Sequence, residues 1–279
     1  MSEAPGSSHT APLSAAAIRG HLGTSWLGRE IVCRDEVDST NTLARDLGRG
    51  GATHGTVVIA EAQNAGRGRL GRGWVSPPGR NLYLSVVLRP VVAPEEVSQL
   101  TLVAGVATCE AVREWCPDAR IKWPNDVLVG GRKVVGILCE MEVGDAGPMV
   151  IAGIGVNLNA ALEDFPEELR DKAGSLAIAL GKRIDRARFT ARLLDRLEQR
   201  LDRFAGRGFA DVASAWETLS GMVGESVRVQ QPGGIVEGRV LGLDADGALR
   251  LAAPSGVEHR VVAGDVTVVG GYGEGAKVP

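Results

Sequence analysis

The sequence has few of the residues that most often bind metal ions or cross-link a chain. Its 279 residues include four cysteines and four histidines, without a C-x-x-C pair, an H-E-x-x-H motif or a Cys/His cluster. Neither a zinc site nor a disulfide framework is therefore predicted. No stretch approaches the roughly 20 uninterrupted apolar residues of a membrane-spanning helix. The beginning of the chain also lacks the basic start and longer apolar run of a signal peptide, so we expect a cytoplasmic protein without a membrane partner.

Lysine is also scarce, and the basic residues are unevenly placed. The chain has 31 Lys and Arg residues against 34 Asp and Glu residues, a net charge of −3. This balance argues against a protein whose whole surface binds nucleic acid. Only five basic residues are lysines, whereas four arginines fall between residues 67 and 80. Glycine, by contrast, is abundant at 38 residues, which predicts tight turns and sites lined by backbone.

The length and the changing pattern of the chain predict two domains. Strand and helix patterns alternate up to about residue 218, and from residue 222 short strands are separated by turn signals every ten or so residues, as in a small β-barrel. We expect a flexible tail at 1–27, an α+β domain at 28–218 and the barrel at 222–270. The α+β domain is expected to contain strands at 30–34, 56–60, 82–88, 120–123, 127–129, 134–141 and 149–156, and helices at 38–47, 94–115 and after residues 185 and 209.

The segment 66–71 follows a predicted strand and has the pattern G-x-G-x-x-G. A dinucleotide-binding fingerprint would need a helix to start at its third glycine and an acidic residue about 20 positions later. The chain instead continues RGWVSPPG, and the next strand ends Leu-Arg-Pro, so this interpretation fails. Arg67, Arg69 and Arg72 on a glycine-rich backbone suit phosphate or carboxylate oxygens. The alternative is a basic loop that is merely solvated. The cost of exposing Trp74 in such a loop argues against it. We therefore expect the loop to bind an anionic small molecule.

Lys122 lies at the end of a predicted strand, before a Pro-Asn-Asp turn. Because Pro124 keeps Trp123 extended, Lys122 and Trp123 are expected to point to opposite faces of the sheet. Such a lysine could be a surface charge. It could also neutralise a carboxylate and a phosphate that meet in one site, and the adjacent Asn125 and Asp126 could hydrogen-bond the same ligand.

Glycines also occur inside predicted strands, at Gly136, Gly153 and Gly155. Strand glycines mark either a β-bulge or the close approach of a ligand or a second backbone, and the sequence leaves both open.

The segment 38–41 (Asp-Ser-Thr-Asn) is typical of a helix N-cap. Its hydroxyls and amide could equally hydrogen-bond a neutral polar group such as a urea, as could Gln63. Ser39 has no histidine in an obvious motif, so it is not proposed as a nucleophile.

Together, these segments resemble the biotin protein ligase family. The resemblance spans residues 38–159, and its motifs occur in the family's order: DSTN at 38–41, GRGRLGRGW at 66–74, KWPND at 122–126, GRKVVGIL at 131–138 and GIGVNLN at 153–159. It implies an α+β fold with a central mixed β-sheet flanked by helices, as in class II aminoacyl-tRNA synthetases, followed by an SH3-like β-barrel.

The resemblance also implies a reaction in two steps. Biotin and ATP, with Mg²⁺, form biotinyl-5′-AMP and pyrophosphate, and a lysine of a biotin carboxyl carrier domain then takes the biotinyl group. ATP, Mg²⁺ and biotin are expected as substrates and activator, without a permanently bound cofactor.

The family's site residues carry over by motif into three overlapping groups. The resemblance implies a catalytic group of Lys122, Arg67 and Arg69. It implies a biotin pocket formed by Ser39, Thr40, Asn41, Gln63, Arg67, Gly68, Arg69, Lys122, Gly136, Gly153 and Gly155. It implies a nucleotide site formed by Arg69, Arg72, Trp74, Asn125, Asp126, Lys133 and Asn157, with the metal expected near Asp126 and Lys133 also expected at the floor of the biotin pocket.

Some family members carry an N-terminal winged-helix domain and repress transcription. The 37 residues before Asp38 are Ala/Ser/Gly-rich, so we expect a ligase without DNA binding, and whether it forms a homodimer stays open. Two alternatives remain. A lipoate or octanoate ligase or transferase on the same core would need a longer apolar channel, and a non-catalytic biotin-binding module would have little use for Lys122.

Overall fold

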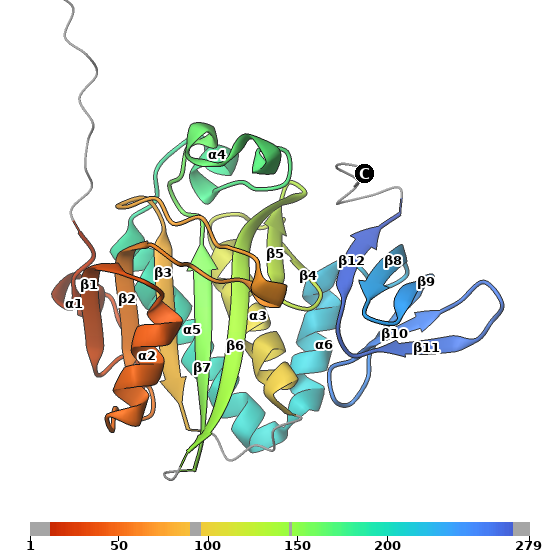
Figure 1. The fold of residues 1–279 in the computed structure, drawn as a ribbon, viewed down its shortest axis with the longest axis horizontal. Helices are drawn as coiled ribbons and strands as arrows, with labels where there is room; N and C mark the ends of the chain where they lie inside the picture. The colour runs from red at the N-terminus through yellow and green to blue at the C-terminus, as the bar shows by residue number, and fades with distance from the viewer. Residues whose placement is uncertain (1–11, 90–95, 145–146, 270–279) are drawn as a thin grey trace, which may run out of the picture.

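A computed structural model describes residues 12–89, 96–144 and 147–269 of the chain. These residues form a large sheet covered by helices and a smaller sheet next to it (Figure 1). No helix among them is long and apolar enough to cross a bilayer.

The large sheet has seven strands in the order β1-β2-β3-β7-β6-β5-β4. β1 and β2 are parallel, and every other neighbouring pair is antiparallel, so the expectation of a mixed sheet is confirmed. The strands are β1 (Ile31–Val37), β2 (Val57–Gln63), β3 (Leu82–Leu88), β4 (Arg120–Lys122), β5 (Asp126–Val129), β6 (Arg132–Gly144) and β7 (Gly147–Val156).

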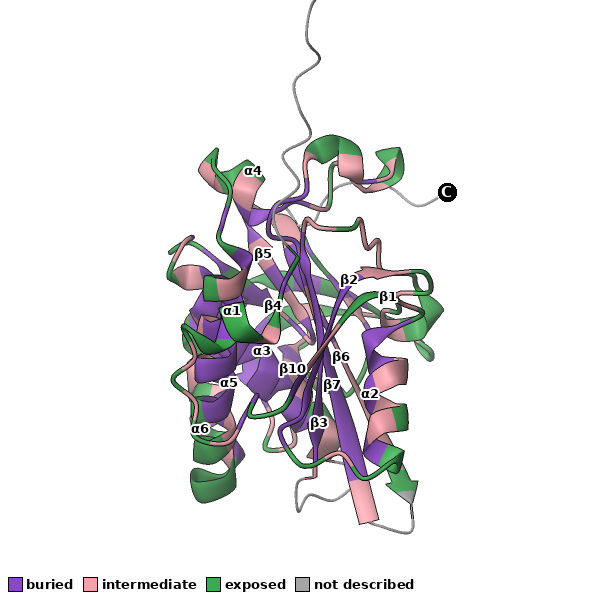
Figure 2. Ribbon diagram, turned by 90° about the vertical axis from the view of Figure 1, so that its left-hand side faces the viewer, coloured by how far each residue is buried: buried purple, intermediate pink, exposed green. Residues whose placement is uncertain are grey.

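Helices cover both faces of this sheet (Figure 2). α3 (Val97–Arg113), α5 (Arg186–Arg207) and α6 (Phe209–Ser220) pack on one face, and α2 (Thr40–Arg49) packs on the other. α3 begins within the expected helix, whose predicted start at residue 94 lies outside the described residues. Two short helices complete the domain, α1 (Ala15–Arg19) and α4 (Leu176–Leu180).

α2 ends at Arg49, two residues beyond the expected end at residue 47, and Gly50 is its C-cap. Gly48 is buried in the last turn, and a Cβ there would lie 2.2 Å from the sulfur of Met149 on β7. The glycine therefore lets the last turn of the helix approach the sheet closely.

The expectation of a flexible tail at 1–27 is wrong for residues 12–27. Ile18 and Leu27 are fully buried in the main core, and the carboxylate of Glu198 on α5 accepts hydrogen bonds from the backbone N–H groups of residues 25–27 at 2.6–2.8 Å. The Ala/Ser/Gly-rich composition concealed this packing because a few well-spaced apolar side chains suffice for it, and the acceptor lies some 170 positions away in sequence. Residues 1–11 lie outside the described part.

The C-terminal sheet has five antiparallel strands in the order β11-β10-β9-β8-β12, the small β-barrel that was expected. It docks on the larger domain through Trp123, whose indole N–H donates to the carbonyl of Gly247 at 3.1 Å. The strands are β8 (Ser226–Gln231), β9 (Gly234–Leu243), β10 (Leu249–Ala252), β11 (Glu258–Val261) and β12 (Asp265–Val268).

Candidate active site

A cavity of about 490 Å³ is lined by residues of the large sheet and of the segment that links β2 to β3. Its walls come from the start of α2, from β3 to β7, from this linking segment and from one residue of β12. Every site residue expected from the sequence lines it: Ser39, Thr40, Asn41, Gln63, Arg67, Gly68, Arg69, Arg72, Trp74, Lys122, Asn125, Asp126, Lys133, Gly136, Gly153, Gly155 and Asn157.

Uncharged polar groups line the end of the cavity near α2. Asn41 is 4% exposed, and its Oδ1 accepts a hydrogen bond from the hydroxyl of Ser85 at 2.6 Å. The backbone N–H of Thr40 donates to Oε1 of Gln63 at 2.9 Å. The side chain of Ser39 makes no capping hydrogen bond to α2, so it is not explained as an N-cap. This end of the cavity suits a neutral ligand group that both donates and accepts hydrogen bonds.

The strand glycines form the floor of the cavity. Gly136 and Gly155 are paired across β6 and β7 in a register without a bulge. A Cβ at either position would lie 2.6 Å from the indole ring of Trp74, and one at Gly153 would lie 2.1 Å from Oδ1 of Asn41. Close approach, and not a β-bulge, therefore accounts for these three glycines.

Trp74 carries a buried donor without an acceptor. Among the described residues, nothing accepts a hydrogen bond from its indole N–H. Lys133 lies over the same ring with its Nζ 5.5 Å from the centroid, a cation–π arrangement, and forms an ion pair with Asp126 at 2.6 Å. A buried indole N–H of this kind normally has a hydrogen-bond acceptor. This donor is therefore placed to bind an acceptor atom of a ligand.

The loop over the cavity is a compact hairpin. The N–H of Gly68 donates to the carbonyl of Arg72 at 2.7 Å, and that of Trp74 donates to the carbonyl of Gly66 at 2.8 Å. At its tip, Leu70 has φ 57° and is 71% exposed. We call residues 66–74 the arginine loop, because this hairpin places its arginines around the cavity mouth.

Each arginine of the loop has a different partner. Nη2 of Arg67 lies 3.1 Å from Glu140, and Nη1 of Arg69 donates to Oδ1 of Asn125 at 3.2 Å. Arg72 forms an ion pair with Asp265 of β12. Burial lowers the pKa of the Arg69 guanidinium, which stays charged because its ordinary value is far above neutrality.

Lys122 differs from the arginines because its ammonium has no partner. Within 12–89, 96–144 and 147–269, the ammonium makes no hydrogen bond or ion pair, although the side chain is half-buried. Burial lowers its pKa, an effect that the carboxylate of Asp126 partly opposes. The next residue, Trp123, is buried on the other side against the barrel, which confirms the expected opposite orientations.

Asn157 lines the cavity, but its amide is already in use. It donates to the carbonyl of Gly174 at 3.0 Å, and its Oδ1 lies 3.4 Å from Nδ2 of Asn81. These contacts hold the 172–174 segment, which also pairs with Lys133 through backbone hydrogen bonds. The structure therefore gives Asn157 a role in shaping the wall.

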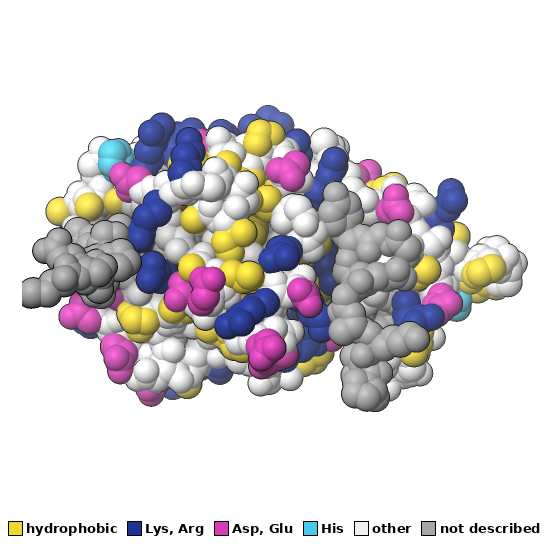
Figure 3. Space-filling model, turned by 90° about the horizontal axis from the view of Figure 1, so that it is seen from above, with side chains coloured by type: hydrophobic (Ala, Val, Ile, Leu, Met, Phe, Trp, Pro, Cys, Tyr) yellow, Lys and Arg dark blue, Asp and Glu magenta, His cyan; other side chains and the backbone are white. Residues whose placement is uncertain are grey.

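Among the lining residues that sequence reasoning missed, two groups come from elements far along the chain. Asp265 comes from the barrel, and a second group comes from the segment before α4: Phe165, Leu169, Asp171, Lys172 and Ala173. Neither group belongs to a recognisable local motif, and both lie far along the chain from the arginine loop. Figure 3 views the molecule from above and shows acidic, basic and hydrophobic side chains near one another at the centre of this side.

Comparisons with known proteins agree with this architecture. Residues 33–157 match the Biotin/lipoate A/B protein ligase family, and residues 223–269 match the Biotin protein ligase C terminal domain. The bifunctional ligase/repressor BirA of Bacillus subtilis is 38% identical over 248 residues, which cover 88% of this chain and 76% of that protein. The chain belongs to the biotin protein ligase family.

Other members of the biotin protein ligase family are equally similar over most of their length. The biotin–[acetyl-CoA-carboxylase] ligase of Mycobacterium tuberculosis is 36% identical, with 91% of this chain and 95% of that protein covered. The ligase of Aquifex aeolicus, solved with biotin and ATP, has a TM-score of 0.73 and 31% identity, with 86% and 98% covered. The first match includes lipoate ligases, so it is the C-terminal match and these relatives that single out the biotin protein ligases.

Proposed function

We propose that this protein activates biotin with ATP to biotinyl-5′-AMP and transfers the biotinyl group to a lysine of a biotin carboxyl carrier domain. The observation that carries the proposal is the half-buried ammonium of Lys122, which has no hydrogen-bond or ion-pair partner among the described residues and faces a cavity that three arginines also line. A cation that is partly removed from water without a hydrogen-bonded ion-pair partner is costly. An anionic ligand would remove that cost.

In the first step, an oxygen of the biotin carboxylate attacks the α-phosphorus of ATP, and the bond to the pyrophosphate oxygen breaks. The reaction brings a carboxylate and a triphosphate together, so positioning and charge neutralisation matter more than proton transfer. We assign these tasks to Lys122, Arg67 and Arg69. Their positions around one cavity, without a histidine among its lining residues, support the assignment.

In the second step, the amine of the acceptor lysine attacks the carbonyl carbon of the mixed anhydride. The C–N bond forms, the C–O bond to the phosphate breaks, the amine loses a proton and AMP leaves. The ammonium of Lys122 would neutralise the developing oxyanion, as preorganised donors do in acyl transfer. Its partnerless state favours this role, because no protein carboxylate must be displaced first.

The remaining lining residues divide the cavity into two ends. We propose that the neutral end holds the bicyclic urea of biotin, through Ser39, Thr40, Asn41 and Gln63. The nucleotide would lie toward Arg72, Trp74, Lys133, Asn125 and Asp126, where the free indole N–H is found. The glycine floor, formed by Gly136, Gly153 and Gly155, would leave room for the indole and the ligand together, with Gly68 and Asn157 shaping the walls.

Magnesium fits this site as an ion that arrives with the nucleotide. Mg²⁺ usually keeps several waters and is held by one or two carboxylates together with substrate phosphates. Asp126 lines the cavity, but it pairs with Lys133, and the described segments contain no cluster of three or more acidic, histidine or cysteine side chains. Bound with ATP near Asp126, the ion would neutralise phosphate oxygens.

We also propose that the protein acts in the cytoplasm. Four cysteines in the described residues are free thiols (Cys33, Cys109, Cys116 and Cys139), as is usual in a reducing compartment.

Pyrophosphate release tests the proposal. The protein is mixed with ATP and Mg²⁺, and biotin, lipoate or octanoate is added in turn, followed by a biotin carboxyl carrier domain. We expect release with biotin only, and covalent biotin on the carrier. Release with lipoate or octanoate only would identify an acyl ligase of the other kind, and biotin binding without release would identify a non-catalytic module.

A further inference from the structure

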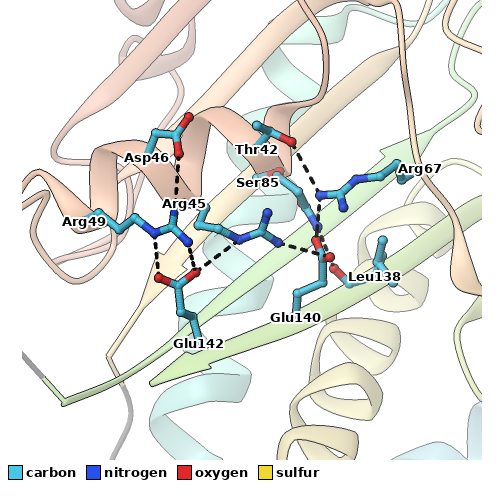
Figure 4. A network of polar contacts seen from close by, with 10 residues as sticks. Thr42, Arg45, Asp46, Arg49, Arg67, Ser85, Leu138, Glu140 and Glu142 are labelled. Atoms are coloured by element: carbon cyan, nitrogen blue, oxygen red, sulfur yellow. Dashed lines mark hydrogen bonds and ion pairs between the residues drawn. The ribbon is translucent and has the colours of Figure 1, made fainter. Parts of the chain in front are cut away.

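An arginine–glutamate network connects α2 and β6 below the arginine loop (Figure 4). Arg49 binds Glu142 through two hydrogen bonds of 2.6 and 2.9 Å. Arg45 contacts both carboxylates of the strand, Glu142 at 3.5 Å and Glu140 at 3.1 Å. Arg67 extends the network from the loop to Glu140. The network thus runs along the helix and ends at the mouth of the cavity.

Glu140 is the member of this network that contacts residues lining the cavity. Its Oε2 accepts hydrogen bonds from Nδ2 of Asn41 at 2.7 Å and from Nη2 of Arg67 at 3.1 Å. Its Oε1 pairs with Arg45. One carboxylate oxygen therefore joins the neutral end of the cavity to the arginine loop.

The contact leaves most of the Arg67 guanidinium available. Its hydrogen bonds, to Glu140 and to the hydroxyl of Thr42 at 3.5 Å, both involve Nη2. In the part of the chain that the structure describes, Nε and Nη1 have no partner. Since a guanidinium has five N–H donors in a fixed fork, a carboxylate on one side orients the others.

We propose that Glu140 is a positioning residue, which holds Asn41 and Arg67 in the orientation that biotin needs. This inference rests on the proposed function, in which Asn41 binds the urea and Arg67 binds the carboxylate. Glu140 would set the two groups at opposite ends of biotin relative to each other. It would also keep the arginine loop docked before ligand binds, which reduces the ordering cost of binding.

The test compares Glu140→Gln with Glu142→Gln. Both changes keep the size of the side chain and remove an ion pair with Arg45, but only the first removes the charge beside Asn41 and Arg67. Two quantities are measured for each variant. The first is the rate of trypsin cleavage within residues 66–74 without ligand, and the second is KM for biotin, with kcat, in the pyrophosphate assay.

For Glu140→Gln we expect about fivefold faster loop cleavage and about fivefold higher KM for biotin, the scale of one partly exposed ion pair. Because Arg67 also serves the chemical step, kcat is expected to fall as well, by about two- to fivefold, while Lys122 and Arg69 stay in place. Glu142→Gln should change neither quantity by more than about twofold. Equal cleavage rates and equal KM values in the two variants would overturn the proposal, since Glu140 would then contribute no more than Glu142 does.

A second variant and the substrate-free assay separate a failure of this inference from a failure of the proposed function. If Glu140→Gln does not fold, Glu140→Asp replaces it, and the same faster cleavage is expected because the shorter carboxylate cannot reach both partners. The cleavage assay needs no substrate. Wild-type protein that releases no pyrophosphate therefore contradicts the proposed function, whereas equal ligand-free cleavage of wild type and Glu140 variants contradicts the role of Glu140.

Discussion

Arg72 in the arginine loop and Asp265 at the start of β12 form an ion pair between the two halves of the molecule. Asp265 lines the same cavity as Lys122 and Arg69. On the opposite side of β4, Trp123 donates to the backbone of the barrel. The barrel thus contacts the larger domain on both sides of β4, and it contributes part of the cavity wall.

Replacing Asp265 should therefore affect nucleotide use more than stability. Both partners are about half exposed, so Asp265→Asn should cost at most about 1 kcal/mol of folding free energy. Because Arg72 loses the ion pair that orients it, KM for ATP is expected to rise about two- to fivefold. Thermal unfolding and initial rates measure the two effects. Glu258→Gln is the control, since it breaks the Arg250 pair elsewhere on the barrel, and an unchanged KM for ATP in Asp265→Asn would contradict the account.

The glycine floor makes a sharper prediction. Gly155→Ala places a Cβ 2.6 Å from the indole of Trp74, which forces the ring away from the floor. Displacing the ring should reduce adenylate formation about 100-fold, since small misplacements at a reacting site are costly. Gly105→Ala is the control, because its Cβ meets its nearest neighbour at 3.9 Å in the middle of α3. Near-normal adenylate formation by Gly155→Ala would show that the indole need not lie there.

The lowered pKa of Lys122 predicts a pH dependence. The ammonium is the active form, and burial favours the neutral amine. Adenylate formation should therefore fall as pH rises through this lowered pKa, below the ordinary lysine value of about 10.4. In Lys122→Arg the rate is expected to be lower, but without that alkaline fall, because a guanidinium does not titrate there. The measurement is kcat for pyrophosphate release from pH 7 upward, and the same alkaline limb in both proteins would contradict the assignment.

The sequence pointed to the residues that line the cavity because they occur in short motifs, in loops, at strand ends and inside two strands. Trp74, Lys122 and the strand glycines were each recognisable from their neighbours, and the topology brings those motifs together. Asp265 could not be found this way, because its position depends on how the barrel docks. Ile18 and Leu27 were missed for a related reason. Their burial depends on packing against α5, which lies far along the chain, so it cannot be predicted from the local composition.

The most direct test of the central claim concerns the ammonium of Lys122. Wild-type protein and Lys122→Met are incubated with biotin, ATP and Mg²⁺, and biotinyl-5′-AMP is quantified by mass spectrometry, with thermal unfolding as the check on folding. Lys122→Met should remain folded and form the adenylate at least about 100-fold more slowly, the cost of one preorganised charge-stabilising group. Adenylate formation at the wild-type rate in the folded variant would contradict the account.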